Sequence, residues 1–324
     1  MIENIIQTIL ILLAIFVPVI RKNNEYGNLS LTRDYTIFLR AIAIVLVVMH
    51  HVSNYFHCNY FTPLGGIGVS MFLIMSGYGL NESYKIKGFS RFWRNKIVRV
   101  LLPCWIVISI ANIIKINDFS IESYMKALLC INVNWYVRYL FYWYLIFYVC
   151  TRFCERFRIL IFSGIGVFML FLPEIEAEQS FSFLVGVVIS NSQHSNNNKM
   201  IDMLNKYKYL IFLCGVVFFL LKQNTVIRSY EGTVIYNGIQ MLVKLPLSIA
   251  AITILNKFYQ KYENKLIDYI GKISYELYLT HCAMLFVLGV SQIALVNIIS
   301  FYLISFLSAI VLFKIDKLIN KKIK

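Results

Sequence analysis

Long uninterrupted blocks of apolar residues are the feature that most constrains how this chain can fold. Three of them, Ile5 to Ile20, Ile97 to Ile114 and Ile293 to Phe313, approach the roughly 20 residues needed to cross a bilayer's hydrocarbon core. Backbone groups in hydrocarbon must be satisfied within their own segment, so each block must be helical. Only 15% of the 324 residues are charged, against about 25% in soluble domains. We therefore predict an all-α, polytopic bundle of transmembrane helices.

The apolar blocks predict about 10–11 spanning helices in one domain. Three blocks are short for a span, so one of them is expected to be tilted, re-entrant or extended into its flanks; they are 159–172, 181–191 and 209–221. The others lie near 5–20, 36–56, 64–82, 97–114, 134–151, 234–256, 273–290 and 293–313. The first block lacks a cleavage pattern and is interpreted as a retained helix rather than a secretory signal.

The distribution of basic residues predicts how the bundle is oriented. Of the 31 lysines and arginines, 24 fall in alternate short loops and in the C-terminal tail, whereas three glutamates cluster on the other side over 174–178. Basic loops face the cytoplasm, so the C-terminus is expected inside and, with eleven spans, the N-terminus outside. A net charge of +15 is also typical of nucleic-acid binding, but its place in short loops between spans favours membrane topology.

The seven cysteines indicate neither a disulfide framework nor a metal site. Their number is odd, they lie mostly inside apolar segments and no C-x-x-C pair occurs, so we expect no disulfide and no metal.

Ionisable residues inside a predicted span are costly and mark candidate functional positions. Arg40 and His51 lie 11 residues apart, close to three helical turns, so they share one stripe of the 36–56 helix about 16 Å apart. They can line one channel, Arg40 towards the basic side and His51 towards the other. A histidine bonded to a neighbouring helix and an arginine extending to the interface are the structural alternatives.

Three further patterns contain candidate residues. The run Gly65 to Gly79, with Ser76 and Tyr78, is typical of close helix packing. The basic stretch 91–99 is either an ordinary positive flank or a phosphate-binding patch formed by Arg94, Lys96 and Arg99, the last two on one helical face. The remaining candidates are Tyr275, His281 and Arg138, of which Arg138 follows aromatic residues typical of a membrane interface.

Taken in order, these motifs resemble the acyltransferase-3 family of integral-membrane acyltransferases that modify cell-surface glycans. The matching features are Arg40-Ala41-Ile42-Ala43 through His51, the Gly68-to-Gly77 run with Tyr78, the stretch 91–99 leading to Pro103, and Ser274-Tyr275 through His281. The resemblance implies about ten helices over residues 34–324, so residues 1–33 would add an extra N-terminal helix and a cytoplasmic linker. It also implies a bacterial-type plasma or inner membrane.

The resemblance further implies acyl-CoA, usually acetyl-CoA, as donor and a sugar hydroxyl as acceptor. Arg40 and His51 would be the essential pair, and Lys96 and Arg99 the family's R-x-x-R element, with lysine in the first position. We expect His51 to act as general base, the basic stretch to hold the CoA phosphates, and Arg40 to orient the donor. The expected reaction is O-acetylation of surface or exported polysaccharide in the cell envelope.

Two other functions remain open from the residues alone. A transporter or exporter of polysaccharide or lipid-linked sugar would also line its path with buried charges, although no internal repeat is present. The second open function is that of an acyltransferase that acts on a lipid or on a protein. Expected partners are membrane lipids and a glycan acceptor, with no nucleic acid; partner proteins of polysaccharide synthesis cannot be named from the residues.

Overall fold

Each predicted apolar block folds as a helix. The computed structural model describes residues 2–17, 19–21, 29–55, 61–115, 117, 119–131, 134–193, 199–293 and 298–323, so Cys58 lies outside the described residues. The first half comprises α1 (Ile2–Phe16), β1 (Ile20–Arg21), α2 (Arg33–Tyr55), α3 (Leu64–Lys87), α4 (Phe92–Lys96), the π-helix η2 (Ile97–Leu101), α5 (Leu102–Ile114), α6 (Ile121–Leu128) and α7 (Trp135–Phe153). The second half comprises η4 (Glu155–Phe157), α8 (Arg158–Met169), α9 (Glu174–Ala177), α10 (Ser182–Gln193), α11 (Lys199–Lys222), α12 (Thr225–Arg228), α13 (Val234–Lys261), β2 (Tyr262–Glu263), α14 (Lys265–Lys272), α15 (Ser274–Ile293) and α16 (Ile298–Ile323).

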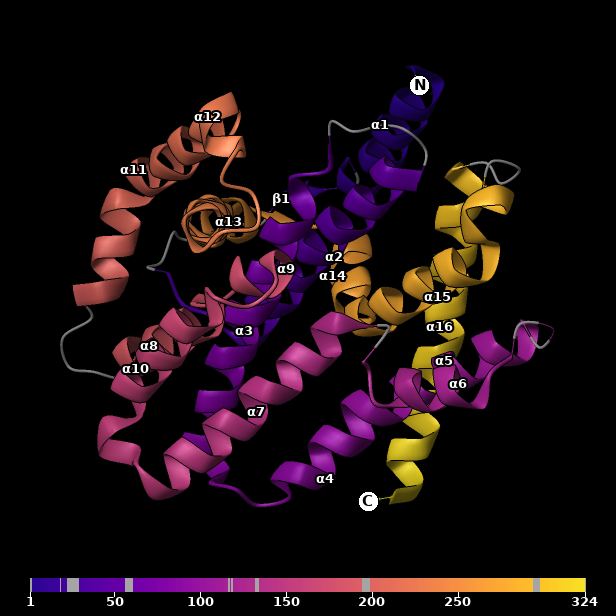
Figure 1. Ribbon diagram of the computed structural model, residues 1–324, viewed down its shortest axis with the longest axis horizontal. Coiled ribbons are helices and arrows are strands. Elements are labelled where there is room, and N and C mark those ends of the chain that lie inside the picture. The colour runs from indigo at the N-terminus through magenta and orange to yellow at the C-terminus, as the bar shows by residue number, and fades with distance from the viewer. Residues whose placement is uncertain are drawn as a thin grey trace.

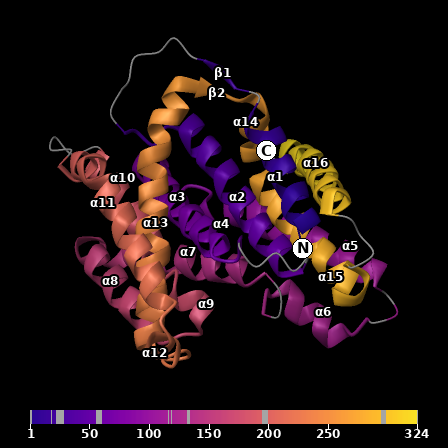
Figure 2. The same cartoon turned by 90° about the horizontal axis from the view of Figure 1, so that it is seen from above.

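The helices form one bundle with α2 and α3 at its centre. Figures 1 and 2 show α11 and α13 on one side of this pair and α5, α15 and α16 on the other. Helix α2 packs against α3, α14 and α15. At one end of the bundle, β1 pairs antiparallel with β2, which joins the chain after α1 to the end of α13. This arrangement buries the central stripe of α2, which contains Leu39, Ala43 and Ile44.

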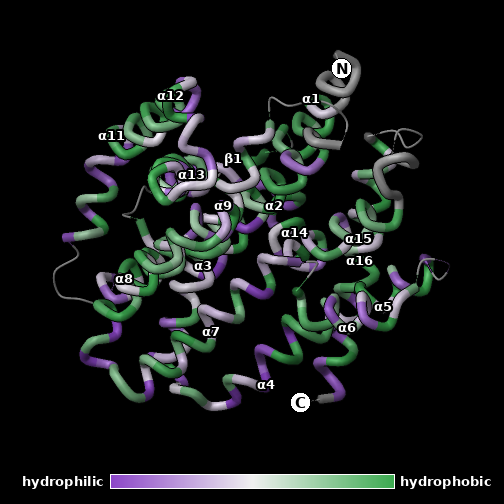
Figure 3. Tube along the Cα trace, viewed as in Figure 1, coloured by the Kyte–Doolittle hydropathy of each residue, from purple (hydrophilic) through white to green (hydrophobic). Residues whose placement is uncertain are grey.

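The lengths of the helices confirm a membrane-embedded bundle. Six helices among the described residues are long and apolar enough to cross a membrane: Arg33–Val52, Leu64–Lys87, Phe92–Ile114, Lys199–Lys222, Val234–Lys261 and Ile299–Lys322. Figure 3 shows their apolar colour giving way to polar residues at α4 and in the last turns of α16.

Two of the three short blocks are indeed short helices, whereas the third is not. Helices α8 and α10 have 12 residues each, about 18 Å at 1.5 Å per residue, against a core of about 30 Å. The block predicted over 209–221 is part of the 24-residue α11 instead. This block is therefore the one that extends into its flank, because the helix continues through the more polar residues that precede the apolar stretch.

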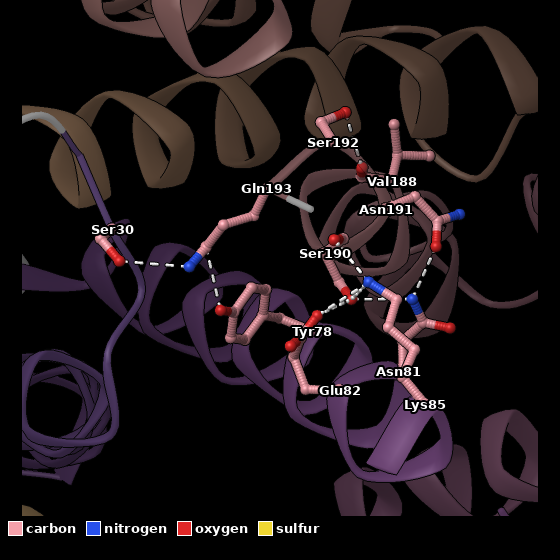
Figure 4. A network of polar contacts seen from close by, with 10 residues as sticks. All are labelled: Ser30, Tyr78, Asn81, Glu82, Lys85, Val188, Ser190, Asn191, Ser192 and Gln193. Atoms are coloured by element: carbon pink, nitrogen blue, oxygen red, sulfur yellow. Dashed lines mark hydrogen bonds and ion pairs between the residues drawn. The ribbon is translucent and has the colours of Figure 1, made fainter. Parts of the chain in front are cut away.

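Helices α3 and α10 approach each other at backbone contact. A Cβ added to Gly77 would lie 2.1 Å from the carbonyl oxygen of Phe183, and one added to Gly186 would lie 1.9 Å from that of Ile74. The close approach brings polar groups of the two helices together, as Figure 4 shows: Tyr78 donates a hydrogen bond of 2.9 Å to the Gln193 side chain. Gly77 therefore serves the close helix packing predicted for the run, and Tyr78 contributes to the same interface.

Candidate functional site

Arg40 on α2 forms no ion pair with any described residue. Its guanidinium interacts electrostatically with the hydroxyls of Tyr136 and Tyr144 on α7, both of which are buried. Arg40 itself keeps an exposed surface, so water-sized space adjoins it between α2 and α7. Within the described chain no carboxylate lies within 4 Å of it and it makes no hydrogen bond. An unpaired cation at this depth is costly, which marks Arg40 as a candidate anion- or carbonyl-binding residue.

A basic pocket of about 550 Å³ lies at the end of the bundle where α2 and α4 begin and α16 ends. Asp316 is its one acidic residue. The residues that line it are Arg33, Arg91, Arg94, Asn95, Val98, Arg99, Asp316, Lys317, Asn320 and Lys321. Such a concentration of guanidinium and ammonium groups suits phosphates, which arginine binds with two parallel hydrogen bonds.

The π-helix η2 separates two residues that were predicted to act together. Pro103 has no N–H to donate to the Arg99 carbonyl, and at this point Leu102 donates to Ile97, five residues back. The Val100 carbonyl accepts a 2.7 Å hydrogen bond from the Tyr275 hydroxyl on α15. Arg99 consequently lines the basic pocket, whereas Lys96 does not.

Lys96 instead connects the basic pocket to the interior. Its ammonium lies 4.0 Å from the ring centroid of Tyr144, a cation–π contact. It interacts electrostatically with both Arg99 and Arg40. A line of positive charge therefore runs from the basic pocket through Lys96 to Arg40. Ser76 on α3 lies next to this line, beside Tyr136.

Three histidines lie in a row at the other end of the α2 stripe. The ring centroids of His50 and His51 are 5.1 Å apart, and those of His51 and His281 are also 5.1 Å apart. The Nδ1 of the fully buried His281 donates a 2.8 Å hydrogen bond to the Leu277 carbonyl, because a carbonyl can only accept. The bundle thus brings His281, 230 residues along the chain, beside His51.

His51 lies where two pockets meet, together with Trp135 and Tyr278. One pocket, of about 420 Å³, is mainly apolar and lies between α5, α6 and α15. The other, of about 410 Å³, contains charged side chains and is called the polar pocket; it includes His50 and the first turn of α3. Its charged and amide residues are Glu174 and Glu178 from the α9 region, Lys222 from α11, and Gln240 and Lys244 from α13.

The polar pocket is held by interactions between the elements that form it. Lys244 and Glu178 form an ion pair of 3.7 Å, and the Gln240 amide donates a hydrogen bond to Glu174. Arg138 lies in neither pocket. It forms a 2.6 Å ion pair with Glu176 and donates to the Ile131 carbonyl, which fixes the short helix α9 against α7.

The comparisons with known proteins fit this geometry. The model of an acyltransferase domain family, acyltransferase-3, matches residues 33–313, most of the chain. The chain belongs to the acyltransferase-3 family. No curated protein and no solved structure matches it.

An acyltransferase must bring an activated acyl group and a nucleophile together, and this one has a partly enclosed place to do so. His51, Trp135 and Tyr278 line both the polar and the apolar pocket, and of these three His51 carries the imidazole that can accept a proton near neutral pH. Sequence reasoning identified Arg40, His51 and the basic stretch but missed Glu174, Gln240 and Lys222. The glutamate cluster and Lys244 within a span were visible, but nothing in their spacing joined them to His51.

His51, His281 and Cys282 also bring three possible metal-ligand atoms within 4.8 Å of one another. Ligand atoms around one tetrahedral zinc lie about 3.4–3.8 Å apart, given metal–ligand bonds of about 2.0–2.3 Å. The Cys282 sulfur and the His281 Nε2 are 3.5 Å apart. The sequence-based prediction of a metal-free acyltransferase stays a prediction.

Proposed function

We propose that this membrane acyltransferase moves an acyl group from cytosolic acyl-CoA to a hydroxyl of a surface or exported polysaccharide. The observation that carries the proposal is the line of positive charge from the basic pocket to the unpaired Arg40, on the helix that also carries His51. CoA, which has phosphates at one end and amide carbonyls along its pantetheine arm, matches that line. Acetyl-CoA is the smallest such donor.

The donor is proposed to enter from the basic end, which faces the cytoplasm by the distribution of lysine and arginine. Arg33, Arg94 and Arg99, with the lysines at the end of α16, would hold the CoA phosphates in the basic pocket. The pantetheine arm would then pass Lys96 and be oriented by Arg40. Arg40 is about 16 Å from His51 along the helix, so it positions the donor rather than the reacting carbonyl.

His51 would act as general base on the acceptor. Its neutral imidazole takes the proton of the sugar hydroxyl as that oxygen attacks the thioester carbonyl. The new C–O bond forms, the C–S bond breaks, and the departing CoA thiolate takes the proton back from the imidazolium. The polar pocket would hold the sugar, whose hydroxyls suit the carboxylates, amines and amide there, with Trp135 available to pack on the sugar ring. The acyl group would thereby be delivered across the membrane.

His51→Ala tests the chemistry. Purified protein in lipid nanodiscs is incubated with labelled acyl-CoA and surface glycan extracted from cells that lack the gene, with EDTA present. Wild type is expected to label the glycan, and His51→Ala to lose about 10²–10⁴-fold in rate at an unchanged melting temperature. Full acylation by His51→Ala would refute His51 as the base. A transporter would be favoured by two results together: the wild-type protein leaves the glycan unlabelled, and the deletion strain no longer exports the glycan.

The donor end needs a separate test with a matched control. Arg99→Ala is expected to raise the KM for acyl-CoA and to leave kcat largely unchanged, because it removes a phosphate contact and not the reacting groups. Arg152→Ala removes an exposed arginine that does not line the basic pocket. The KM for acyl-CoA should therefore be higher for Arg99→Ala than for Arg152→Ala. Equal KM values in the two variants would contradict the assignment of the pocket to CoA.

A further inference from the structure

The apolar pocket at His51 is not needed by the steps above. It is lined on α5 by Val107, Ile108 and Ala111 and on α15 by Leu279, Ala283 and Leu285, among others. Polar side chains of this pocket, such as Asn112, Ser123 and Asn134, are neutral. The polar pocket on the other side of His51 contains two carboxylates and two amines. A hydrocarbon chain that starts at His51 is therefore compatible with the apolar pocket but not with the polar pocket, where it would lie against charged groups.

A groove on the membrane-facing surface adjoins this pocket. The groove, of about 390 Å³, lies between α5, α15 and α16 and shares Val107, Ala111 and Ala283 with the apolar pocket. Its outer wall includes Leu307 and Val311, which are 59% and 58% exposed and so face lipid. Two alanines stand at the junction, where a larger side chain would narrow the passage. The apolar pocket and the groove thus lie next to each other between His51 and the lipid-facing surface.

We infer that the acyl group transferred is longer than acetyl, and that its hydrocarbon tail lies in the apolar pocket and the groove beyond it. The inference rests on the proposed function, because the thioester carbonyl must lie at His51 and its tail must then extend from there. A two-carbon acyl group would leave this space unused. Each further methylene taken from water into an apolar pocket raises affinity about fourfold. Because the groove is open to lipid, it imposes no sharp upper limit on chain length.

A chain-length series tests the inference. Purified protein in nanodiscs is given acetyl-, butyryl-, octanoyl- or palmitoyl-CoA with glycan from cells that lack the gene, and acylated glycan is quantified by mass spectrometry. Wild type is expected to use octanoyl-CoA with a kcat/KM at least about tenfold above that of acetyl-CoA. Ala283→Phe and Ala111→Phe, which fill the junction, should lower kcat/KM for octanoyl-CoA more than kcat/KM for acetyl-CoA and so abolish this preference. Leu213→Phe on lipid-exposed α11 is the matched control and should behave as wild type.

The possible outcomes separate this inference from the proposed function. Wild type that uses acetyl-CoA alone, or all lengths equally, would overturn the inference and leave acyl transfer standing; in that case bilayer lipid fills the groove. Loss of every chain length in both phenylalanine variants at unchanged melting temperature would also overturn it, since the junction would then belong to the reacting site. No turnover with any acyl-CoA would overturn the proposed function and this inference with it.

Discussion

Replacement of Arg40 is expected to lower activity and to raise stability, and these opposite effects test its role. The guanidinium has no ion-pair or hydrogen-bond partner in the described chain, and a charge within a span costs free energy, up to about 2.5–3.5 kcal/mol at the centre of the bilayer. Arg40→Gln should therefore raise the melting temperature, by about 2–4 °C for each kcal/mol recovered, while lowering kcat/KM for acyl-CoA by about 10²-fold. Differential scanning fluorimetry and the labelled-donor assay measure the two effects.

Arg40→Lys separates charge from geometry. Lysine keeps the charge but loses the planar fork that binds two oxygens at once, so activity between those of wild type and Arg40→Gln is expected. Arg228→Gln, at an exposed arginine on α12, serves as the control for loss of charge alone. A fall in the melting temperature of Arg40→Gln would show instead that Arg40 holds the bundle together.

Residue spacing predicted the Arg40–His51 stripe but not the surroundings of either residue. An 11-residue interval on a helix follows from local geometry, which is why the stripe could be recognised. The neighbours Tyr136, Tyr144 and His281 come from helices far along the chain and depend on how the helices pack. Lys96 and Arg99 show the converse failure: their i, i+3 spacing predicts one shared face only in a regular α-helix, and η2 is not one.

The pairing of α3 with α10 gives a prediction at the scale of elements. A methyl group at Gly186 would overlap the Ile74 carbonyl at 1.9 Å, and backbone cannot yield as a flexible side chain does. Gly186→Ala should separate the two helices and cost about 1–3 kcal/mol or more, seen as a lower melting temperature in detergent. It should also break the hydrogen bond between Tyr78 and Gln193.

Gly79 on the same helix is the matched control. A Cβ there meets nothing within 4 Å, and alanine is favoured over glycine within a helix by about 1 kcal/mol. Gly79→Ala should therefore leave the melting temperature unchanged or raise it. A similar loss of stability in both variants would mean that glycine flexibility, rather than the close approach of α3 and α10, is what the run supplies.

At the scale of the whole molecule, hydropathy located the helices but not the pockets between them. Every predicted span contains a helix, because about 20 apolar residues in a row leave few alternatives. The polar pocket escaped prediction because its residues come from α2, α7, α9, α11 and α13. Polar residues at the ends of spans have the same composition whether they face water, lipid headgroups or a shared pocket, so only the packing distinguishes them.

The orientation of the bundle is the prediction on which donor and acceptor access depend. The basic pocket gathers the starts of α2 and α4 and the end of α16 at one end, whereas the polar pocket includes the end of α11 and the region of α9. Eleven crossings, as predicted from the apolar blocks, would place the two termini on opposite faces. A green fluorescent protein fused after Lys324 should therefore fluoresce inside the cell, and an epitope before Met1 should bind antibody on intact spheroplasts.

A cysteine introduced at Glu231, in the exposed turn between α12 and α13, supplies the independent check. A membrane-impermeant maleimide should label Glu231→Cys in intact cells, and Lys317→Cys in the basic pocket only after permeabilisation, with wild type as the background for native cysteines. Labelling of Lys317→Cys from outside would place the basic pocket on the wrong face for cytosolic CoA. Because the phosphates of CoA cannot cross the bilayer unaided, that result would exclude the proposed donor path whatever activity His51→Ala retained.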